Sequence, residues 1–457
     1  MLLQKSFAQE WEQKEAQATS KIKSNPKFFY LYANRFSKSK PKVGPLIDPV
    51  TNKLTDDPLL MANILQNQYK SVFTKPLHNY DLHPLESQIP TLEDINLTIE
   101  DFVKEIGTLS PNSAPGPDGF PAILLLETKH NIALPLSIIW RNILNKGITP
   151  KLLKSSHISP VYKNGNQGLP ENYRPVALTS HVSKVFEKIV RAKIQNHLEE
   201  NNLYNDNQHG FRKGRSCLSQ LLQHTERLIH YLENGNNIDV IYLDFSKAFD
   251  RVDHTILLYK LRRNGINGKL LEWIRSFLTH RTQRVSVNST LSAETEVISG
   301  VPQGSVLGPL LFLIMIQDID NNIFHSILAS FADDTRLMKE ISKPEDVCHL
   351  QNDLQTVYKW TKDNNMQLNG LKFEHLAYRK NDALKEHSRY FSDTATLIEN
   401  KDQVKDLGIT LDSKLTYEKH IQDQIKKVKN ISAWIYRTFK SRKIETCLLY
   451  TSDAADE

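Results

Sequence analysis

The stretch YLDFSKAFD (242–250) decides the fold of this chain, because its apolar start runs directly into a carboxylate, Asp244. The stretch FADD (331–334) repeats the pattern, since a mostly apolar run again ends on acidic residues, here Asp333 and Asp334. We expect each run to be a strand and both strands to deliver their carboxylates to one edge of a sheet. Carboxylate oxygens suit Mg²⁺, which takes few protein carboxylates and shares its coordination with substrate phosphates. Two such ions can stabilise the attacking and leaving oxygens of a phosphoryl displacement.

An Asp at a strand end, or an Asp-Asp pair, is most often only a turn residue. That interpretation does not account for what lies between and before the two acidic stretches. SGVPQGSVLGPLLF (299–312) falls between them, and SPVYKNGNQGLPENYRPVALTSHVSKVFEKIV (159–190) precedes both. Four motifs in one order are a specific signal, whereas FADD alone is weak.

These motifs resemble those of reverse transcriptases, and most closely the non-LTR retrotransposon (LINE, jockey-like) group, in which FADD replaces the retroviral YxDD. The resemblance runs from about Ser24 to Arg442. It implies an α+β fold, that of a right-hand polymerase with fingers, palm and partial thumb, whose palm is an antiparallel sheet backed by helices. It also implies an RNA-directed DNA polymerase that extends a DNA primer on an RNA template from dNTPs. Two Mg²⁺ ions are the implied cofactors, with Mn²⁺ as a possible substitute.

The resemblance assigns roles to single residues at the acidic edge. It makes Asp244 and Asp333 metal ligands, joined by the backbone carbonyl of Phe245, while Asp334 tunes the site or contacts the metal weakly. Phe249, five positions after Asp244, matches an aromatic gate that excludes the 2′-hydroxyl of ribonucleotides. Outside this motif, Phe249 would be taken for a core residue.

Further residues are assigned to the nucleotide. Lys163 and Arg174 resemble the pair that grips the triphosphate, Arg as a bidentate partner and Lys as a point charge. Gln303 resembles the residue that buttresses nucleotide and template, and Gly304 lets the backbone approach closely. Lys372 matches a lysine proposed to protonate departing pyrophosphate, although NGLKFE departs from the usual N-x-x-K-C/S-x pattern.

Contacts with nucleic acid are expected from basic residues in HGFRKGRSC (209–217) and in the stretch 426–443. The residues concerned are Arg212, Lys213, Arg215, Lys426, Lys427 and Lys429. Such contacts position a nucleic-acid backbone without specifying sequence. A stretch at 21–43 combines seven basic residues with interleaved aromatic ones and no acidic one, which suits phosphate attraction and base stacking. Either of the stretches 21–43 and 426–443, taken alone, is equally well a solvated basic face.

The chain divides into a helical linker with the basic aromatic segment (1–95), fingers and palm (96–412, the core from about 144), a partial thumb (413–446) and a tail (447–457). Apolar spacing and turn residues predict the main elements. We expect a polar helix over 1–20, helices at 58–73, 131–146, 183–199, 253–264 and 306–316, a turn at 116–119 before a further helix, and strands at 239–245, 327–332 and 335–338. VKDLGITLD (404–412) resembles the primer-grip hairpin.

Composition bounds the remaining alternatives. The chain has 457 residues, 39% of them hydrophobic and 24% charged, with a net charge of +6, which predicts a soluble globular protein. Its three cysteines show no paired spacing, and no signal peptide is present, so we expect an intracellular protein with reduced thiols. No run is long enough to span a bilayer. Composition does not indicate an oligomeric state.

Two other functions stay open. One is a catalytically silent RNA-binding relic of a retroelement, and the other is a polymerase of the group II intron or telomerase type. We place no endonuclease or ribonuclease H segment, and we expect a polymerase fragment open at both ends that does not nick target DNA. CLLYTSDAADE (447–457) resembles a translated sequencing-library adapter, so we expect this tail to be non-native.

Overall fold

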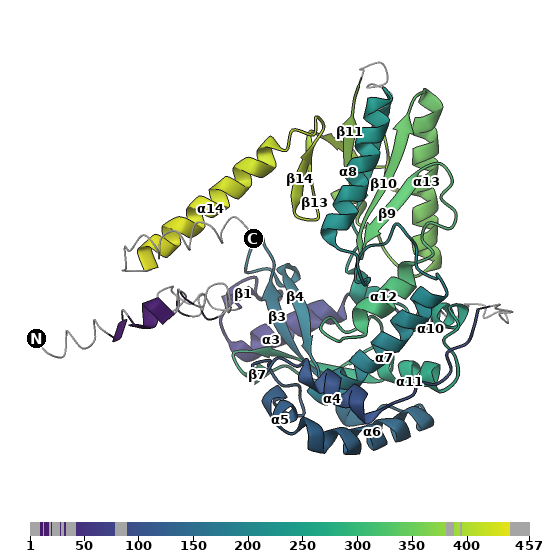
Figure 1. Ribbon diagram of the computed structural model, residues 1–457. Helices are drawn as coiled ribbons and strands as arrows, with labels where there is room; N and C mark the ends of the chain where they lie inside the picture. The colour runs from purple at the N-terminus through teal and green to yellow at the C-terminus, as the bar shows by residue number, and fades with distance from the viewer. Residues whose placement is uncertain are drawn as a thin grey trace, which may run out of the picture. The chain divides into compact units, whose positions relative to one another are not determined.

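The computed structural model describes residues 10–11, 13–17, 20, 28, 32, 43–77, 89–380, 388–393 and 395–438 (Figure 1). Contacts divide the chain into two compact units, one of Lys42–Asp402 and one made of Met1–Pro41 with Gln403–Glu457. Most of the basic aromatic stretch, most of the predicted helix over 1–20 and the whole tail over 447–457 lie outside the described residues.

The larger unit carries most of the helices and strands. Its helices are α3 (Pro58–Lys70), α4 (Ile99–Gly107), α5 (Ala122–Glu127), α6 (Lys129–Lys146), α7 (His181–Glu200), α8 (Cys217–Glu233), α9 (Ala248–Arg251), α10 (His254–Arg263), α11 (Gly268–Leu278), α12 (Gly308–Ile316) and α13 (Pro344–Asp363). Its strands are β1 (Leu46–Ile47), β2 (Leu54–Thr55), β3 (Ser155–Tyr162), β4 (Tyr173–Leu178), β5 (Asn237–Leu243), β6 (Arg281–Val287), β7 (Thr290–Leu291), β8 (Thr295–Val297), β9 (Ile327–Phe331), β10 (Asp334–Ile341), β11 (Glu374–Tyr378) and β12 (Glu399–Lys401). Short 3-10 turns lie at η1 (Lys151–Lys154), η2 (Pro170–Asn172) and η3 (Gly370–Lys372).

One five-stranded sheet, here called the central sheet, has the order β12-β11-β5-β10-β9. Strand β5 lies in its middle and pairs antiparallel with both β10 and β11, while β9 returns antiparallel along β10. Only β11 and β12 pair in parallel. Helix α8 packs against β5 and α13 against β10 (Figure 1). The predicted α+β class, with a mainly antiparallel sheet backed by helices, is confirmed.

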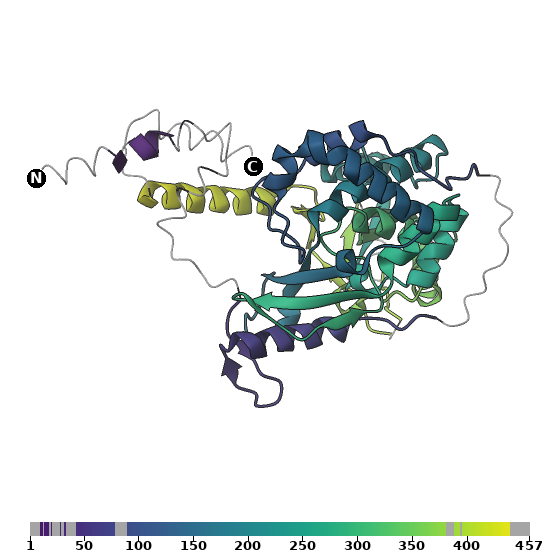
Figure 2. The same cartoon turned by 90° about the horizontal axis from the view of Figure 1, so that it is seen from below.

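A second sheet, here called the outer sheet, has the order β4-β3-β6-β7, with β8 also paired to β6. Strands β3 and β6 are parallel, and the other pairs are antiparallel. Figure 2 shows α3 lying along one face of this sheet, where its contacts are with β6, β7 and β8. The apolar side of α3, with Leu65 and Tyr69, fills a small core against Ile158 and Val285.

The larger hydrophobic core lies between the helices and the central sheet. Its aromatic centre joins three helices, because Trp140 of α6 stacks on Phe186 of α7 at 4.2 Å, and Phe186 meets Trp273 of α11 edge-on at 4.9 Å. Helix α12 is buried along nearly its whole length, which explains its uniformly apolar sequence. The carboxylate of buried Glu187 accepts hydrogen bonds from the backbone N–H groups of Val306 and Leu307, and so holds the start of this helix.

The second unit contributes, among the described residues, the hairpin β13 (Gln403–Asp406) and β14 (Ile409–Asp412), followed by α14 (Glu418–Thr438). The antiparallel register joins Val404 to Leu411, as the prediction of a hairpin over 404–412 requires. Asp412 accepts hydrogen bonds from the backbone N–H groups of Thr416 and Tyr417, so it fixes the chain between the hairpin and the helix.

Most predicted elements are confirmed, with small differences at their ends. The helices expected at 58–73, 131–146, 183–199, 253–264 and 306–316 are α3, α6, α7, α10 and α12. Asp253 caps α10 as predicted, since its carboxylate accepts from Thr255 N at 2.9 Å. Strand β5 begins earlier than predicted and ends at Leu243, one residue before Asp244. Within the described residues, no helix is long and apolar enough to cross a bilayer.

Candidate active site

The two acidic strand ends meet at one edge of the central sheet. The register pairs Thr335 with Leu243, so the turn that carries Asp333 lies beside the residue that follows β5, Asp244. Ala332 forms this turn with a left-handed φ of 57°. Burial raises the pKa of the Asp333 carboxyl, and the negative charge of Asp244 raises it further. Asp334 is exposed at the start of β10. The structure therefore brings the predicted carboxylates together.

The backbone beside Asp244 directs a carbonyl to the same edge. Asn369 N donates to Asp244 O at 2.8 Å, and Ser246 N donates to Gln367 O at 2.8 Å. Successive residues of a strand alternate the side to which their N–H and C=O groups point. The carbonyl of Phe245 therefore points away from this neighbour and towards the side on which β10 lies. This orientation agrees with the predicted contribution of the Phe245 carbonyl to a metal site.

The donor set at this edge fits a hard divalent cation. Asp244 and Asp333 offer carboxylate oxygens and repel each other electrostatically, so a cation between them would favour the ionised form of both. No cluster of three or more His, Cys, Asp or Glu side chains suited to a metal exists among the described residues. Two carboxylates and a carbonyl match Mg²⁺, which completes its shell with water and substrate phosphates.

Lys372 reaches the carboxylate of Asp244 from the turn that precedes β11. It ends η3, the turn before β11, and its Nζ lies 3.2 Å from Asp244 Oδ2. Its side chain is 66% exposed, so the ammonium borders open solvent rather than the core. The structure thus places Lys372 beside the acidic edge, as the sequence motif predicts. Its role as a proton donor stays a prediction.

A group of basic side chains faces the acidic edge from the outer sheet and from the loop after β5. Lys163 follows β3, Arg174 lies on β4, and Lys247 has a left-handed backbone with φ 52°. Burial lowers the pKa of Lys163, and the positive charges of Lys247, Arg174 and Lys372 lower it further. Lys372 is paired with Asp244, and the charge of Asp250 offsets part of the repulsion at Lys163. A cluster of basic groups beside carboxylates is a suitable place for a triphosphate, whose negative charge they would bind.

Phe249 has the partial exposure that a gate requires. Its ring stacks on Phe312 of α12, with centroids 4.4 Å apart and planes 17° apart, and it meets Phe211 edge-on at 6.4 Å. One face of the ring is therefore held by the core. The side chain as a whole is only half-buried. The geometry fits the predicted gate, while sugar selection itself stays a prediction.

The PQG turn is fixed against β4. Ala177 N donates to Gln303 O at 2.6 Å. Gly304 has φ 124°, and a Cβ atom there would lie 2.4 Å from Ala177 O, so only glycine fits. The side chain of Gln303 donates to Asp250 Oδ1 at 2.8 Å. These contacts place the predicted nucleotide-binding residues Gln303 and Gly304 close to the strand that carries Arg174.

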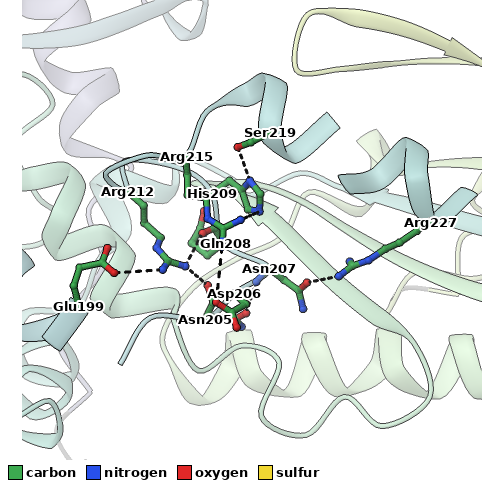
Figure 3. Close-up of polar contacts among 10 residues, drawn as sticks. All are labelled: Glu199, Asn205, Asp206, Asn207, Gln208, His209, Arg212, Arg215, Ser219 and Arg227. Atoms are coloured by element: carbon green, nitrogen blue, oxygen red, sulfur yellow. Dashed lines mark hydrogen bonds and ion pairs between the residues drawn. The ribbon is translucent and has the colours of Figure 1, made fainter. Parts of the chain in front are cut away.

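The loop before α8 braces the hairpin that carries Asp333. Gln208 Oε1 accepts from Gly210 N at 2.8 Å and from Ala332 N at 3.0 Å. His209 N donates to Ser330 O, and Ser330 N donates to Asn207 O, at 3.1 and 3.0 Å. Figure 3 shows the side chains of this loop, where Arg212 lies among Asn205, Gln208 and Glu199. The loop therefore supports the hairpin.

This geometry corrects the prediction for Arg212. Its Nη1 donates to Asn205 O at 2.7 Å and its Nη2 lies 3.7 Å from Glu199, while its side chain is only 8% exposed (Figure 3). A guanidinium occupied in this way is not available to a template phosphate. Lys213 and Arg215 lie on the exposed side of the same loop, so contact with a template stays a prediction for them.

The predicted basic residues of the second unit lie on α14. Lys426, Lys427 and Lys429 are all exposed on this helix. Their contact with nucleic acid stays a prediction.

Three residues with clear roles in this geometry were not predicted from the sequence. Asp250 holds Gln303, Lys247 adds a positive charge, and Gln208 braces the turn beside Asp333. Asp250 and Lys247 lie inside the motif DFSKAFD, so their position was a usable signal. Gln208 gave none, because its role depends on a backbone 124 residues away.

Comparison with known proteins identifies the family. A family model described as reverse transcriptase (RNA-dependent DNA polymerase) matches residues 161–411, which is more than half of the chain. The chain therefore belongs to the reverse transcriptase family. Its relatives include RNA-directed DNA polymerases of Drosophila non-LTR transposons, as the motifs predict.

Three relatives illustrate this similarity. The probable RNA-directed DNA polymerase from transposon BS of Drosophila melanogaster is 28% identical over 348 residues, which are 74% of this chain and 38% of that protein. The polymerase from mobile element jockey of the same species is 30% identical over 71% of this chain and 36% of that protein. Its counterpart from Drosophila funebris is 28% identical over 79% and 40%. This chain thus spans about two fifths of the length of these relatives.

Among solved structures, an apo telomerase from Candida tropicalis, truncated from its C-terminal domain, aligns with a TM-score of 0.42 at 13% identity. The alignment covers 63% of this chain and 60% of that chain. A likeness this distant carries no argument about the site.

Proposed function

We propose that this chain is the RNA-directed DNA polymerase part of a non-LTR retrotransposon protein, which extends a DNA primer on an RNA template from dNTPs. One observation carries the proposal. The carboxylates of Asp244 and Asp333 meet at the edge of the central sheet, and a group of four basic side chains lies beside them. A polymerase needs this pairing, since the carboxylates hold cations and the basic groups hold the triphosphate. An intracellular location stays a prediction.

The chain's own residues bind and orient the reactants. Asp244, Asp333 and the carbonyl of Phe245 would hold Mg²⁺, with Mn²⁺ as the substitute. Bound there, the ions would stabilise charge on the attacking primer 3′-oxygen and the leaving pyrophosphate oxygen. Lys163 and Arg174 bind the triphosphate and orient its α-phosphate for in-line attack.

Two side chains complete the proposed reaction. Lys372 donates a proton from Nζ to the departing pyrophosphate, since charge builds on that oxygen as the bond breaks. Phe249 lies beneath the sugar and excludes a 2′-hydroxyl by steric contact. Lys213 and Arg215 contact the template backbone, and Lys426, Lys427 and Lys429 contact the primer–template duplex, by charge.

Primer extension tests the proposal. The protein is given poly(rA) annealed to an oligo(dT) primer, dTTP and Mg²⁺. We expect extension by the unmodified protein and a loss of about a thousandfold or more in Asp244→Ala and in Asp333→Ala, because each change removes charge stabilisation at the reacting phosphate. Binding of poly(rA) should stay within a few fold. Asp363→Ala, which removes an exposed carboxylate at the end of α13, is the matched control and should not change extension.

The outcomes separate the alternatives. Extension that persists in either site variant would show that the metal-ligand assignment is wrong. An unmodified protein that binds RNA tightly but never extends the primer would show the silent RNA-binding relic. Extension on a DNA template alone, with none on RNA, would contradict the proposed template.

A further inference from the structure

Asp250 is a half-buried carboxylate between the proposed sugar gate and the PQG turn. It follows Phe249 in α9, and its Oδ1 accepts from Gln303 Nε2 at 2.8 Å. The mechanism above gives Asp250 no role in metal binding. A carboxylate held in this place has either a structural or a positioning role, and its surroundings distinguish the two.

Residues 299–301, which directly precede the PQG turn, form hydrogen bonds with the backbone around Asp250. Ser299 Oγ donates to Asp250 O, and Val301 N donates to Phe249 O, both at 2.8 Å. Gly300 has φ 87°, and a Cβ atom there would lie 2.7 Å from Asp250 O. The gate residue and the PQG segment are therefore joined by backbone contacts, to which the side chains of Asp250 and Gln303 add one more link.

The link continues to the residues that face the triphosphate. Gln303 O accepts from Ala177 N of β4, the strand on which Arg174 lies. A movement of the Gln303 backbone therefore acts directly on the strand that carries a triphosphate-binding residue. Gln303 is the only side chain for which the described residues show a hydrogen bond to the Asp250 carboxylate.

A small cavity lies on the inner side of this arrangement. It has a volume of about 40 Å³, and its lining includes Asp250, Gln303, Tyr69, Arg281 and Gln283. Tyr69 and Arg281 are both buried. The carboxylate therefore borders a small, largely apolar hollow, and its contact with Gln303 is only partly exposed to water.

We propose that Asp250 is a positioning residue for nucleotide binding, whose carboxylate holds the Gln303 amide and, through it, the PQG turn. This inference rests on the proposed function, because Gln303 and Arg174 are taken to contact the incoming dNTP. Asp250 itself does not touch the reacting atoms.

Near neutral pH, the Asp250 carboxyl group carries a negative charge. Burial raises the pKa of Asp250, and the hydrogen bond from Gln303 and the charges of Lys247, Lys163 and Arg174 offset part of that rise, so that the pKa is about 6. The other ionisable groups that line the cavity are Tyr69, whose pKa burial raises, and Arg281, whose pKa burial lowers to about 10. Near neutral pH the carboxylate is thus a charged acceptor, which makes the stronger hydrogen bond.

Steady-state incorporation of dTTP on poly(rA) with an oligo(dT) primer tests this role. In Asp250→Ala we expect the KM for dTTP to rise about tenfold to a hundredfold, the usual loss for a hydrogen bond to a charged group, while kcat falls less than about threefold. Asp250→Asn retains an acceptor oxygen for Gln303 and should stay much closer to the unmodified protein. The double variant Asp250→Ala with Gln303→Ala should be no worse than Gln303→Ala alone, because both changes remove one interaction.

Asp253→Ala is the matched control. Asp253 lies three residues further along, is buried, and accepts from Thr255 N, Leu77 N and Asn365 Nδ2. Its carboxylate forms no hydrogen bond with the PQG turn within the described residues. Its loss should lower thermal stability and leave the KM for dTTP unchanged. An equal rise in KM in this control would mean that any loosening of the loop has the same effect, and it would overturn the proposal.

Hydrogen exchange separates this inference from the proposed function. In Asp250→Ala, amide exchange in residues 299–307 should become faster, and in Asp253→Ala it should not. This measurement does not need activity, so an unmodified protein that fails to extend primers would overturn the proposed function, while hydrogen exchange would still decide whether Asp250 holds the PQG turn. Unchanged exchange in Asp250→Ala, or effects on KM that simply add in the double variant, would overturn the proposal.

Discussion

The two ends of strand β5 both carry buried or half-buried aspartates, and their electrostatics are opposite. At the start of the strand, Asp239 is fully buried, with Arg379 Nη1 at 2.5 Å, His375 Nε2 at 3.3 Å and the Tyr390 hydroxyl donating at 2.6 Å. Burial alone would raise the pKa of Asp239, but contacts with His375 and Arg379 outweigh it and lower the pKa well below the usual range.

At the other end of β5, the carboxylates are not neutralised in this way. Burial raises the pKa of Asp333, and Asp244 adds to that rise. The partner of Asp244 is Lys372, whose flexible side chain is mostly exposed. An ion pair in water contributes little, so this end keeps its negative charge available. The difference teaches that one end of the strand stabilises the fold, and the other holds charge for a cation supplied from outside.

Removing the charge of Asp239, which its neighbours neutralise, should have the largest effect on the stability of the fold. We expect Asp239→Asn to lower the free energy of unfolding by about 3–5 kcal/mol, because the largely buried guanidinium of Arg379 would lose its counterion. Urea unfolding followed by circular dichroism measures this difference. A midpoint equal to that of the unmodified protein would break the comparison, because Asp239 would then contribute no more than a surface charge.

For Asp250 we expect the opposite effect, since removing its charge should raise the free energy of unfolding at neutral pH. Its folded pKa of about 6 lies above the usual value of 3.8, so the folded state binds more protons and stability falls as pH rises from about 4 to about 6. Above pH 6 the whole cost of burying the charge is present. Asp250→Asn should therefore be more stable than the unmodified protein by about 1–3 kcal/mol at neutral pH, with no difference below about pH 4. A variant less stable at pH 7 would contradict this account.

Phe249 tests whether the end of β5 that leads into Asp244, here called its open end, also selects the sugar of the nucleotide. Shortening it to Ala should raise the use of UTP relative to dTTP about tenfold, as expected when a steric exclusion worth about 1.4 kcal/mol is lost. The measurement compares kcat/KM for the two nucleotides on poly(rA). A lower unfolding midpoint with unchanged selectivity would mean that Phe249, stacked on Phe312, is only a core residue.

The smallest effects are expected in the loop before α8. Its residues Arg212 and Arg215 form a matched pair of basic residues for comparison. Arg215→Gln should weaken binding to poly(rA) about threefold at low salt, because one phosphate contact is lost, with a shallower salt dependence. Arg212→Gln should instead lower stability by about 1–2 kcal/mol and leave binding by the folded protein unchanged, since its donors are used inside the loop. Equal losses of binding in both variants would restore the original prediction for Arg212.

Sequence reasoning found the fold and the acidic edge because the signals are local. An apolar run ending on Asp244, and another ending on Asp333, define two strands without knowledge of the rest of the chain. The neutralisation of Asp239 was not predictable in the same way. In the strand NIDVIYL it is one acidic residue in an apolar run, and its partners come from positions 375, 379 and 390.

The correction at Arg212 has a related cause. HGFRKGRSC reads as a uniformly basic loop, and only the path of the chain shows which cations turn inward. Glu199 lies at the end of α7 and Asn205 in the following loop, and both contact Arg212 only after the loop folds back. Sequence spacing assigns charge to a segment, whereas burial divides that charge between support of the fold and contact with a partner.

The dependence of stability on Mg²⁺ tests the central claim most directly, because it asks whether the open end of β5 holds charge for a cation. A cation that binds only the folded state raises its stability, by about 2.7 kcal/mol at one hundred times the dissociation constant. We predict that millimolar Mg²⁺ raises the unfolding midpoint of the unmodified protein and of Asp363→Ala, and that it has no effect on Asp333→Asn. An equal rise in Asp333→Asn, or no rise in the unmodified protein, would contradict the account.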